Sequence, residues 1–170
     1  MRKVVKFGGS SLASAQQFEK VAEIVHAEAS RRYVVPSAPG KRFRKDTKVT
    51  DMLYHCYELA EQSKAFNKQL NQIKDRYNEI IYGLKLDLSL DEDFEIIKKQ
   101  FVAKAGSMYA ASRGEYLNGK IMAKYLGYEF VDAANVIRFN KDGSFDSEPT
   151  NELLATYLDK IERAVIPGFY

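Results

Sequence analysis

The opening segment KFGGSS, residues 6–11, brings together residue types that can hold a phosphate. Glycine at positions 8 and 9 lets a phosphate approach backbone N–H groups without a Cβ clash, and consecutive N–H groups form an anion-binding nest. Lys6 adds a positive charge of the kind that a transferring phosphoryl group needs. An ordinary tight turn with a surface lysine explains the same letters, because the segment is neither a P-loop nor a Rossmann fingerprint. Both interpretations stay open.

A second loop of small residues, SAPG at 37–40, repeats this arrangement. Each loop follows an apolar run typical of a buried strand, Val4–Phe7 before the first and Tyr33–Val35 before the second. Apolar residues at helical spacing between the runs predict a helix over 15–31, which makes a βαβ unit with parallel strands. Loops at the carboxyl ends of parallel strands bind ligands in open α/β sheets. We therefore expect one shared pocket, with Ser37 either a donor to a ligand carboxylate or a turn residue.

Glu115 has two explanations. In SRGE, residues 112–115, it forms an S-x-x-E capping box, and the helix dipole favours a carboxylate in the first turn. The alternative is that Glu115 faces the pocket and binds a substrate ammonium group. The local sequence favours the capping explanation. The basic loop 41–48 is similarly open, because such a run either contacts phosphates or is a solvated surface loop.

The rest of the chain predicts helices with a few short strands. Between about residues 50 and 105, apolar residues in helical stripes indicate two or three successive helices and no strand. The helix that SRGE opens ends at Gly127, a typical residue just past a helix C-terminus. The elements expected after it are strands at Tyr128–Val131 and Ala134–Phe139, a turn at Asn140–Gly143, a helix over Asn151–Arg163 and a last strand from Ala164.

Composition limits the classes of function. The 170 residues are 45% apolar and 29% charged, which is normal for a globular protein, and a net charge of +3 is too small to indicate nucleic-acid binding. No apolar run reaches the roughly eighteen residues of a membrane helix, and the single cysteine, Cys56, forms no intrachain disulfide. His26 and His55 belong to no cluster with metal-ligand spacing. We expect a cytoplasmic protein with no nucleic-acid or membrane partner and no metal bound by its own side chains.

Five segments, taken in order, resemble the aspartokinases of the amino-acid kinase family. They are VVKFGGSS at 4–11, VVPSAPGK at 34–41, VTDML at 49–53, SRGEYLNGKIMA at 112–123 and VIPGF at 165–169. Each segment alone is a weak signal, but five in the family's order over nearly the whole chain are specific. The helical stretch at about 50–105 also resembles the helical insertion of aspartokinases, which helps to separate them from acetylglutamate and uridylate kinases.

The resemblance implies an α/β fold, a three-layer αβα sandwich with a mostly parallel sheet. It implies transfer of the γ-phosphoryl group of ATP, accompanied by Mg²⁺, to the side-chain carboxylate of L-aspartate. This reaction is the first step toward lysine, threonine and methionine. The resemblance also implies a homo-oligomer for the full-length protein. A carboxylate is already ionised at neutral pH, so the reaction needs no catalytic histidine.

Residue roles follow from the same resemblance. Lys6 matches the lysine that stabilises the transferring phosphoryl group, and Gly8, Gly9 and Ser10 match the positions that hold phosphate. Glu115 matches the glutamate that binds the substrate amino group. The other matches to the aspartate site are Ser37, Thr50 and Phe169.

Some family features have no counterpart in residues 1–170. They are the later GRGGSD segment, the nucleotide-base pocket and the C-terminal ACT domains, so we expect the N-terminal part of a catalytic domain that is inactive by itself. Pro36 stands where relatives usually carry an aliphatic residue and is expected to shorten its strand. Two other functions stay open: a sibling kinase acting on another carboxylate or phosphate acceptor, and a non-catalytic anion-binding fragment that uses the loop 41–48.

Overall fold

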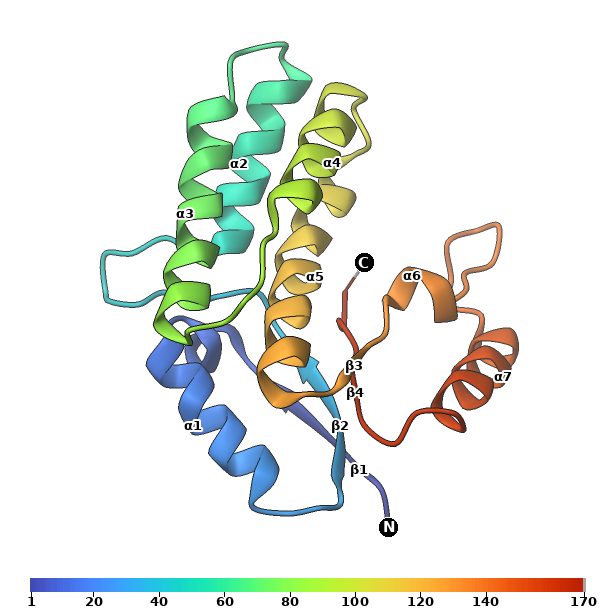
Figure 1. Cartoon of the computed structure of the whole chain (residues 1–170). Helices are drawn as coiled ribbons and strands as arrows, with labels where there is room; N and C mark the ends of the chain where they lie inside the picture. The colour runs from blue at the N-terminus through green and yellow to red at the C-terminus, as the bar shows by residue number, and fades with distance from the viewer. Residues whose placement is uncertain (170) are drawn as a thin grey trace.

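Four parallel strands lie at the centre of the computed structural model, which describes residues 1–169 (Figure 1). The strands are β1 (Lys3–Phe7), β2 (Arg31–Pro36), β3 (Glu129–Phe130) and β4 (Ala164–Val165), in the spatial order β1-β2-β4-β3. Every ladder between them is parallel. The predicted parallel sheet, and the βαβ unit that begins it, are therefore confirmed.

Helices cover both faces of this sheet. Alternate side chains of a strand point to opposite faces. Val34 and Val165 accordingly pack in a large core with α1 and α5, while Tyr33 and Ala164 pack in a smaller core with α6 and α7 (Figure 1). This is the expected three-layer arrangement. The helical elements of residues 1–169 are η1 (Gly9–Leu12, a 3-10 turn), α1 (Ala15–His26), α2 (Val49–Glu61), α3 (Asn67–Gly83), α4 (Asp91–Val102), α5 (Ser107–Leu126), α6 (Ala133–Val136) and α7 (Ser147–Leu158).

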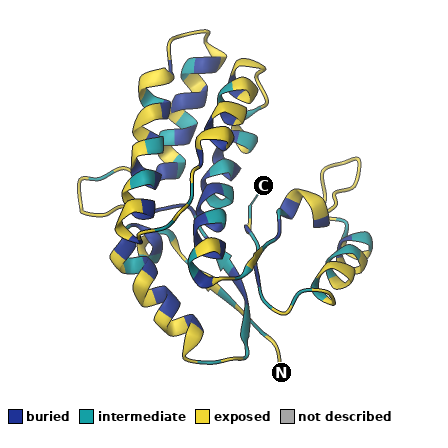
Figure 2. Cartoon of the chain, viewed as in Figure 1, coloured by how far each residue is buried: buried dark blue, intermediate teal, exposed yellow. Residues whose placement is uncertain are grey.

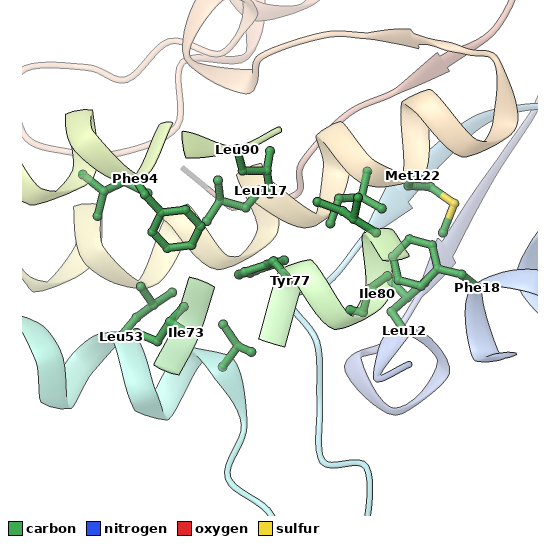
Figure 3. Packing of buried hydrophobic residues seen from close by; sticks show 14 of the residues in the cluster. Leu12, Phe18, Leu53, Ile73, Tyr77, Ile80, Leu90, Phe94, Leu117 and Met122 are labelled. Carbon is green, nitrogen blue, oxygen red and sulfur yellow. The ribbon is translucent and has the colours of Figure 1, made fainter. Parts of the chain in front are cut away.

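The long helix α5 joins the sheet to a helical bundle. Its contacts include β2, β3 and β4 on one side and α2, α3 and α4 on the other, and most of its residues are buried or half-buried (Figure 2). One continuous core results, running from Phe18 and Met122 near the sheet through Tyr77 to Leu53 and Phe94 in the bundle (Figure 3). The prediction that about residues 50–105 form successive helices without a strand is confirmed by α2, α3 and α4.

The boundaries of several predicted elements were wrong. Helix α1 ends at His26 rather than near residue 31, because Arg31 already pairs with Lys3 in the sheet. The strand predicted at Ala134–Phe139 is instead the short helix α6, which Asp132 caps by accepting a hydrogen bond from the N–H of Ala134. Helix α7 covers Ser147–Leu158, so it begins four residues and ends five residues earlier than the predicted helix over Asn151–Arg163.

Two expectations for the first strands also needed correction. Pro36 does not shorten β2, because it pairs with Phe7 and the next N–H, that of Ser37, donates to the Phe7 carbonyl at 3.0 Å. The strand β1 is not buried on both faces, since Val4 is 66% exposed. It lies at the edge of the sheet, and the core formed with α6 and α7 includes β2 and β4 but no residue of β1. No helix within residues 1–169 is long and apolar enough to cross a membrane.

Candidate functional site

The two glycine loops interlock at the carboxyl ends of β1 and β2. The N–H of Gly40 donates to the carbonyl of Gly9 at 2.8 Å. A Cβ atom on Gly9 would lie 2.7 Å from the Ala38 carbonyl oxygen, and one on Gly40 would lie 2.6 Å from the Gly9 carbonyl carbon. Real Cβ atoms do not come so close to backbone, so this approach requires glycine at both positions.

A cavity of about 520 Å³ opens where these loops meet. It brings together five residues to which the resemblance assigned a role, together with residues of the two loops that the sequence marked as open. The five are Gly9, Ser10, Ser37, Thr50 and Glu115, and the loop residues that bear on binding are Gly40, Lys41 and Lys48. Lys6, Gly8 and Phe169 do not line the cavity.

Lys6 nevertheless lies beside it. It pairs with Val35 in the parallel ladder, so both side chains project from the same face of the sheet. A Cβ atom on Gly168 would lie 2.9 Å from Cγ1 of Val35, which places the segment containing Gly168 and Phe169 along that face. Lys6 is exposed, and its charge acts on the Glu115 carboxyl.

The capping explanation of Glu115 is wrong. Helix α5 begins at Ser107, so Glu115 stands in its third turn, and the Ser112 hydroxyl donates to the Tyr109 carbonyl at 2.8 Å instead of capping a helix. The carboxylate of Glu115 accepts a hydrogen bond from the N–H of Gly168 at 3.1 Å and lines the cavity. A helix interior has no N–H groups to satisfy, so this carboxylate is available for a ligand.

The surroundings of Glu115 shift its pKa in two directions. Burial raises the pKa of this carboxyl above its ordinary value, since a buried carboxylate loses hydration. The N–H of Gly168, the charge of Lys6 and the N–H of Phe169 act in the opposite direction, and the net shift is upward. The site therefore favours a cation beside Glu115, because a cation would restore the charged form.

Asn118 was missed by the sequence reasoning. It is fully buried one turn after Glu115, and its side-chain amide donates to the Ser37 carbonyl at 2.7 Å. This hydrogen bond fixes the start of the loop 37–40 to α5. A polar residue three positions from Glu115 lies on the same helix face, and that spacing was the signal available in the sequence.

The basic loop 41–48 divides into two parts. Arg42 pairs with Asp46 at 2.9 Å and with Glu79 at 2.6 Å, so its charge is neutralised within the protein. Lys41 and Lys48 line the cavity and have no ion-pair partner within residues 1–169. Only these two lysines of the loop add net positive charge to the cavity wall.

A second cavity, of about 540 Å³, lies between α2 and α3. Its wall carries the carboxylates of Asp46, Asp51, Asp75 and Glu79 and no glycine loop, and its two arginines, Arg42 and Arg76, are already paired with Asp46 or Glu79. Phosphate groups bind to backbone N–H groups and cations rather than to carboxylates. The cavity at the strand ends is therefore the candidate site, although the two are similar in size.

The candidate site suits a phosphate better than a metal ion. Its polar groups are hydroxyls, two lysines and a single carboxylate, whereas Mg²⁺ is usually held through one or two carboxylates together with substrate phosphates. Within residues 1–169, no three His, Cys, Asp or Glu side chains are placed to hold a metal ion.

The family model described as Amino acid kinase family matches residues 1–170. The chain belongs to this family. A curated relative, aspartokinase 3 of Bacillus subtilis (strain 168), is 34% identical over 182 residues, covering 99% of this chain and 40% of that protein. The chain thus spans about two fifths of the length of this relative.

Solved structures agree with this membership. The chain matches the crystal structure of Clostridium acetobutylicum aspartate kinase with a TM-score of 0.94 and 48% identity, over 98% of this chain and 39% of that one. It matches E. coli aspartokinase III, solved in complex with aspartate and ADP, with a TM-score of 0.78, over 99% and 40%. At 22% identity the second match supports the fold alone.

The interlocked glycines give a prediction about stability. We expect Gly9→Ala to destabilise the protein by about 1–3 kcal/mol, because the new methyl group meets backbone atoms that cannot move aside. Gly8→Ala is the matched control, since a Cβ atom there meets nothing within 4 Å and the backbone is extended, with φ −76°. Urea unfolding followed by circular dichroism measures both. Equal destabilisation by the two variants would contradict the interlock.

The raised pKa of Glu115 gives a pH-dependent prediction. The folded state binds a proton on this carboxyl more tightly than the unfolded state, so its contribution to stability is present below the unfolded pKa and is lost as pH rises through the folded one. Glu115→Gln removes that titration and keeps an acceptor for Gly168. We expect the unliganded variant to gain stability relative to the native protein as the pH rises above about 4.3, the ordinary pKa of a glutamate, until the folded carboxyl has ionised. A pH-independent difference between their urea midpoints would refute this.

Proposed function

We propose that this chain forms part of an aspartate kinase, which transfers the γ-phosphoryl group of ATP to the side-chain carboxylate of L-aspartate. One observation carries the proposal. The interlocked glycine loops, the cavity lysines and the half-buried Glu115 meet at one edge of the sheet, in a chain 48% identical to Clostridium acetobutylicum aspartate kinase. The curated relative from Bacillus subtilis, aspartokinase 3, which is 34% identical, supports the same assignment.

The loop that follows β1, residues 8–11, is proposed to bind the phosphate groups. Phosphoryl transfer spreads negative charge over the transferring oxygens, and fixed N–H groups and cations stabilise that charge. We assign this role to Lys6, with the backbone N–H groups of Gly8, Gly9 and Ser10. Lys41 and Lys48 add positive charge at the cavity wall.

The opposite wall of the cavity, which includes Glu115, is proposed to bind aspartate. Glu115 supplies a carboxylate for the substrate ammonium group, and the upward shift of its pKa by burial supports this role, since a nearby cation would stabilise the charged form. Ser37 and Thr50 supply hydroxyls that can donate to substrate carboxylates. The backbone of Phe169 lies next to Glu115 and completes this group.

The chemistry requires positioning and positive charge rather than a general base. A side-chain oxygen of aspartate attacks the γ-phosphorus and forms a new P–O bond. The bond from that phosphorus to the bridging oxygen breaks, and ADP leaves with the electron pair. No proton is transferred, because the attacking carboxylate is already ionised. Mg²⁺ is proposed to arrive bound to the ATP phosphates, since the described residues offer no binding set for it.

A sibling reaction is the second candidate, because the glycine loops and Lys6 would serve any acceptor of the family. Glu115 is the observation that favours an amino-acid acceptor with a free ammonium group. The non-catalytic alternative rested on the basic loop, and the pairing of Arg42 with Asp46 and Glu79 weakens it. A cytoplasmic location and a homo-oligomeric full-length protein belong to the same proposal, since they rest on the resemblance.

The deciding experiment measures ADP release by the full-length protein with ATP and Mg²⁺. The acceptors to compare are L-aspartate, N-acetylglutamate, glutamate and UMP. We expect turnover with L-aspartate alone. Turnover only with another acceptor would keep the mechanism and replace the substrate, and turnover with none would overturn the proposed function.

Lys6→Ala tests the phosphoryl-transfer role within that assay. We expect kcat to fall on the order of a hundredfold or more while the KM for aspartate changes less, as for a contact that strengthens in the transition state. Lys3→Ala is the matched control on the same strand. Lys3 pairs with Glu28 at the other end of β1, and a partly exposed ion pair contributes little, so kcat should stay near the native value. A change in KM alone for Lys6→Ala would limit Lys6 to substrate binding.

A further inference from the structure

Arg76 lies in the helical bundle, yet its side chain reaches the loop beside the candidate site. It belongs to α3 and is only 5% exposed. One terminal nitrogen, Nη2, donates to the Gly40 carbonyl at 3.0 Å. The other, Nη1, donates to the Asp46 carboxylate at 2.9 Å and to the Thr47 carbonyl at 3.3 Å. A single guanidinium group therefore holds both ends of the segment 40–47.

Asp46 also ties Arg42 to the far end of the same segment. Besides Arg76, its carboxylate accepts hydrogen bonds from the backbone N–H and the Nε of Arg42, both at 2.9 Å. These contacts hold the pKa of the Asp46 carboxyl far below its usual range. The two arginines and Asp46 thus form one hydrogen-bonded network across the base of the loop.

The segment that this network holds is part of the cavity wall. Gly40 lies against Gly9, and both line the cavity. Lys41 and Lys48 flank the segment on either side of Asp46 and also line the cavity. Beyond it, the N–H of Val49 donates to the Pro39 carbonyl at 3.1 Å and begins α2, which carries Thr50. Moving Gly40 would therefore move both walls of the site.

The network is better suited to fixing geometry than to adding stability. Desolvation of a buried ion pair offsets much of its Coulombic gain. Arg76 also keeps one N–H, at Nε, without a hydrogen-bond partner within residues 1–169, which adds to the cost of burying it. What the guanidinium provides is a planar fork that meets a carbonyl on one arm and a carboxylate on the other, and lysine offers no such fork.

We infer that Arg76 is a positioning residue for the candidate site, which it serves by holding the segment 40–47 in place. Arg76 does not touch the cavity's phosphate loop or the proposed substrate groups. It acts through Gly40 and Asp46 on the loop that runs from Ser37 to Thr50. Ser37 and Thr50 are the two hydroxyl residues proposed to bind aspartate. The inference about catalysis rests on the proposed function, whereas the inference about the loop rests on the contacts alone.

The test compares Arg76→Lys with Lys74→Arg, a matched reverse exchange on the same helix. Lys74 pairs with Asp91, on the far side of α3 from the loop, so its exchange should leave the site unchanged. For Arg76→Lys we expect amide hydrogen exchange across residues 40–49 to become at least tenfold faster, with α5 unaffected. In the full-length enzyme the KM for aspartate should rise at least tenfold, with a smaller change in kcat.

The outcomes separate the two parts of the inference. Unchanged exchange across 40–49 would overturn the role of Arg76 in holding the loop. Faster exchange with an unchanged KM would overturn its role in the reaction. If the native protein does not use aspartate, the proposed function fails, and the exchange measurement still decides whether Arg76 holds the loop. Should Arg76→Lys not fold, Asp46→Asn leaves Arg76 in place, removes the carboxylate and should change exchange in the same direction.

Discussion

The contact between Gly9 and Gly40 is the constraint on which the site depends. The backbone of each loop occupies the space where a side chain on the other would stand. Because β1 and β2 are parallel neighbours, their carboxyl ends bring the loops to the same edge of the sheet. The backbones of the two loops meet there without intervening side chains, and glycine loops of this kind can present N–H groups to a phosphate.

Helix α5 supplies the other half of the site. Its burial on both sides fixes its rotation, so Glu115 and Asn118 face the sheet edge while neighbouring residues fill the bundle core. Tyr77 reinforces this rotation by donating from α3 to the Gly114 carbonyl at 2.8 Å. The helical bundle lies outside the αβα layers, yet it sets the position of the Glu115 carboxylate, which we propose binds the substrate ammonium group.

Sequence patterns predicted the features that depend on neighbours along the chain. The βαβ unit, the strand-end loops and the helical stretch follow from local periodicity and glycine. The start of α5 could not be predicted from the local sequence, because SRGE matches the pattern of a capping box without forming one. The helix starts instead after Gly106, which has φ 103° and donates its N–H to the Tyr57 hydroxyl. The role of Arg76 could not be predicted from the sequence either, since its hydrogen-bond partners lie 29 to 36 residues earlier in the chain.

The basic residues near the cavity fall into two groups: arginines that are paired within the protein and lysines that line the cavity. Arginine is well suited to bind anions, but Arg42 and Arg76 do not line the candidate cavity. Asp46 forms ion pairs with both of them, and Glu79 forms an ion pair with Arg42. Lysines supply the remaining positive charge, and a lysine is a flexible point charge that can follow a phosphoryl group as it moves. The rigid guanidinium groups hold the loop, and the flexible ammonium groups of Lys41 and Lys48 line the cavity. Among the described residues that line the cavity, only Glu115 carries a carboxylate, so the wall has one place suited to an ammonium group and several suited to anions.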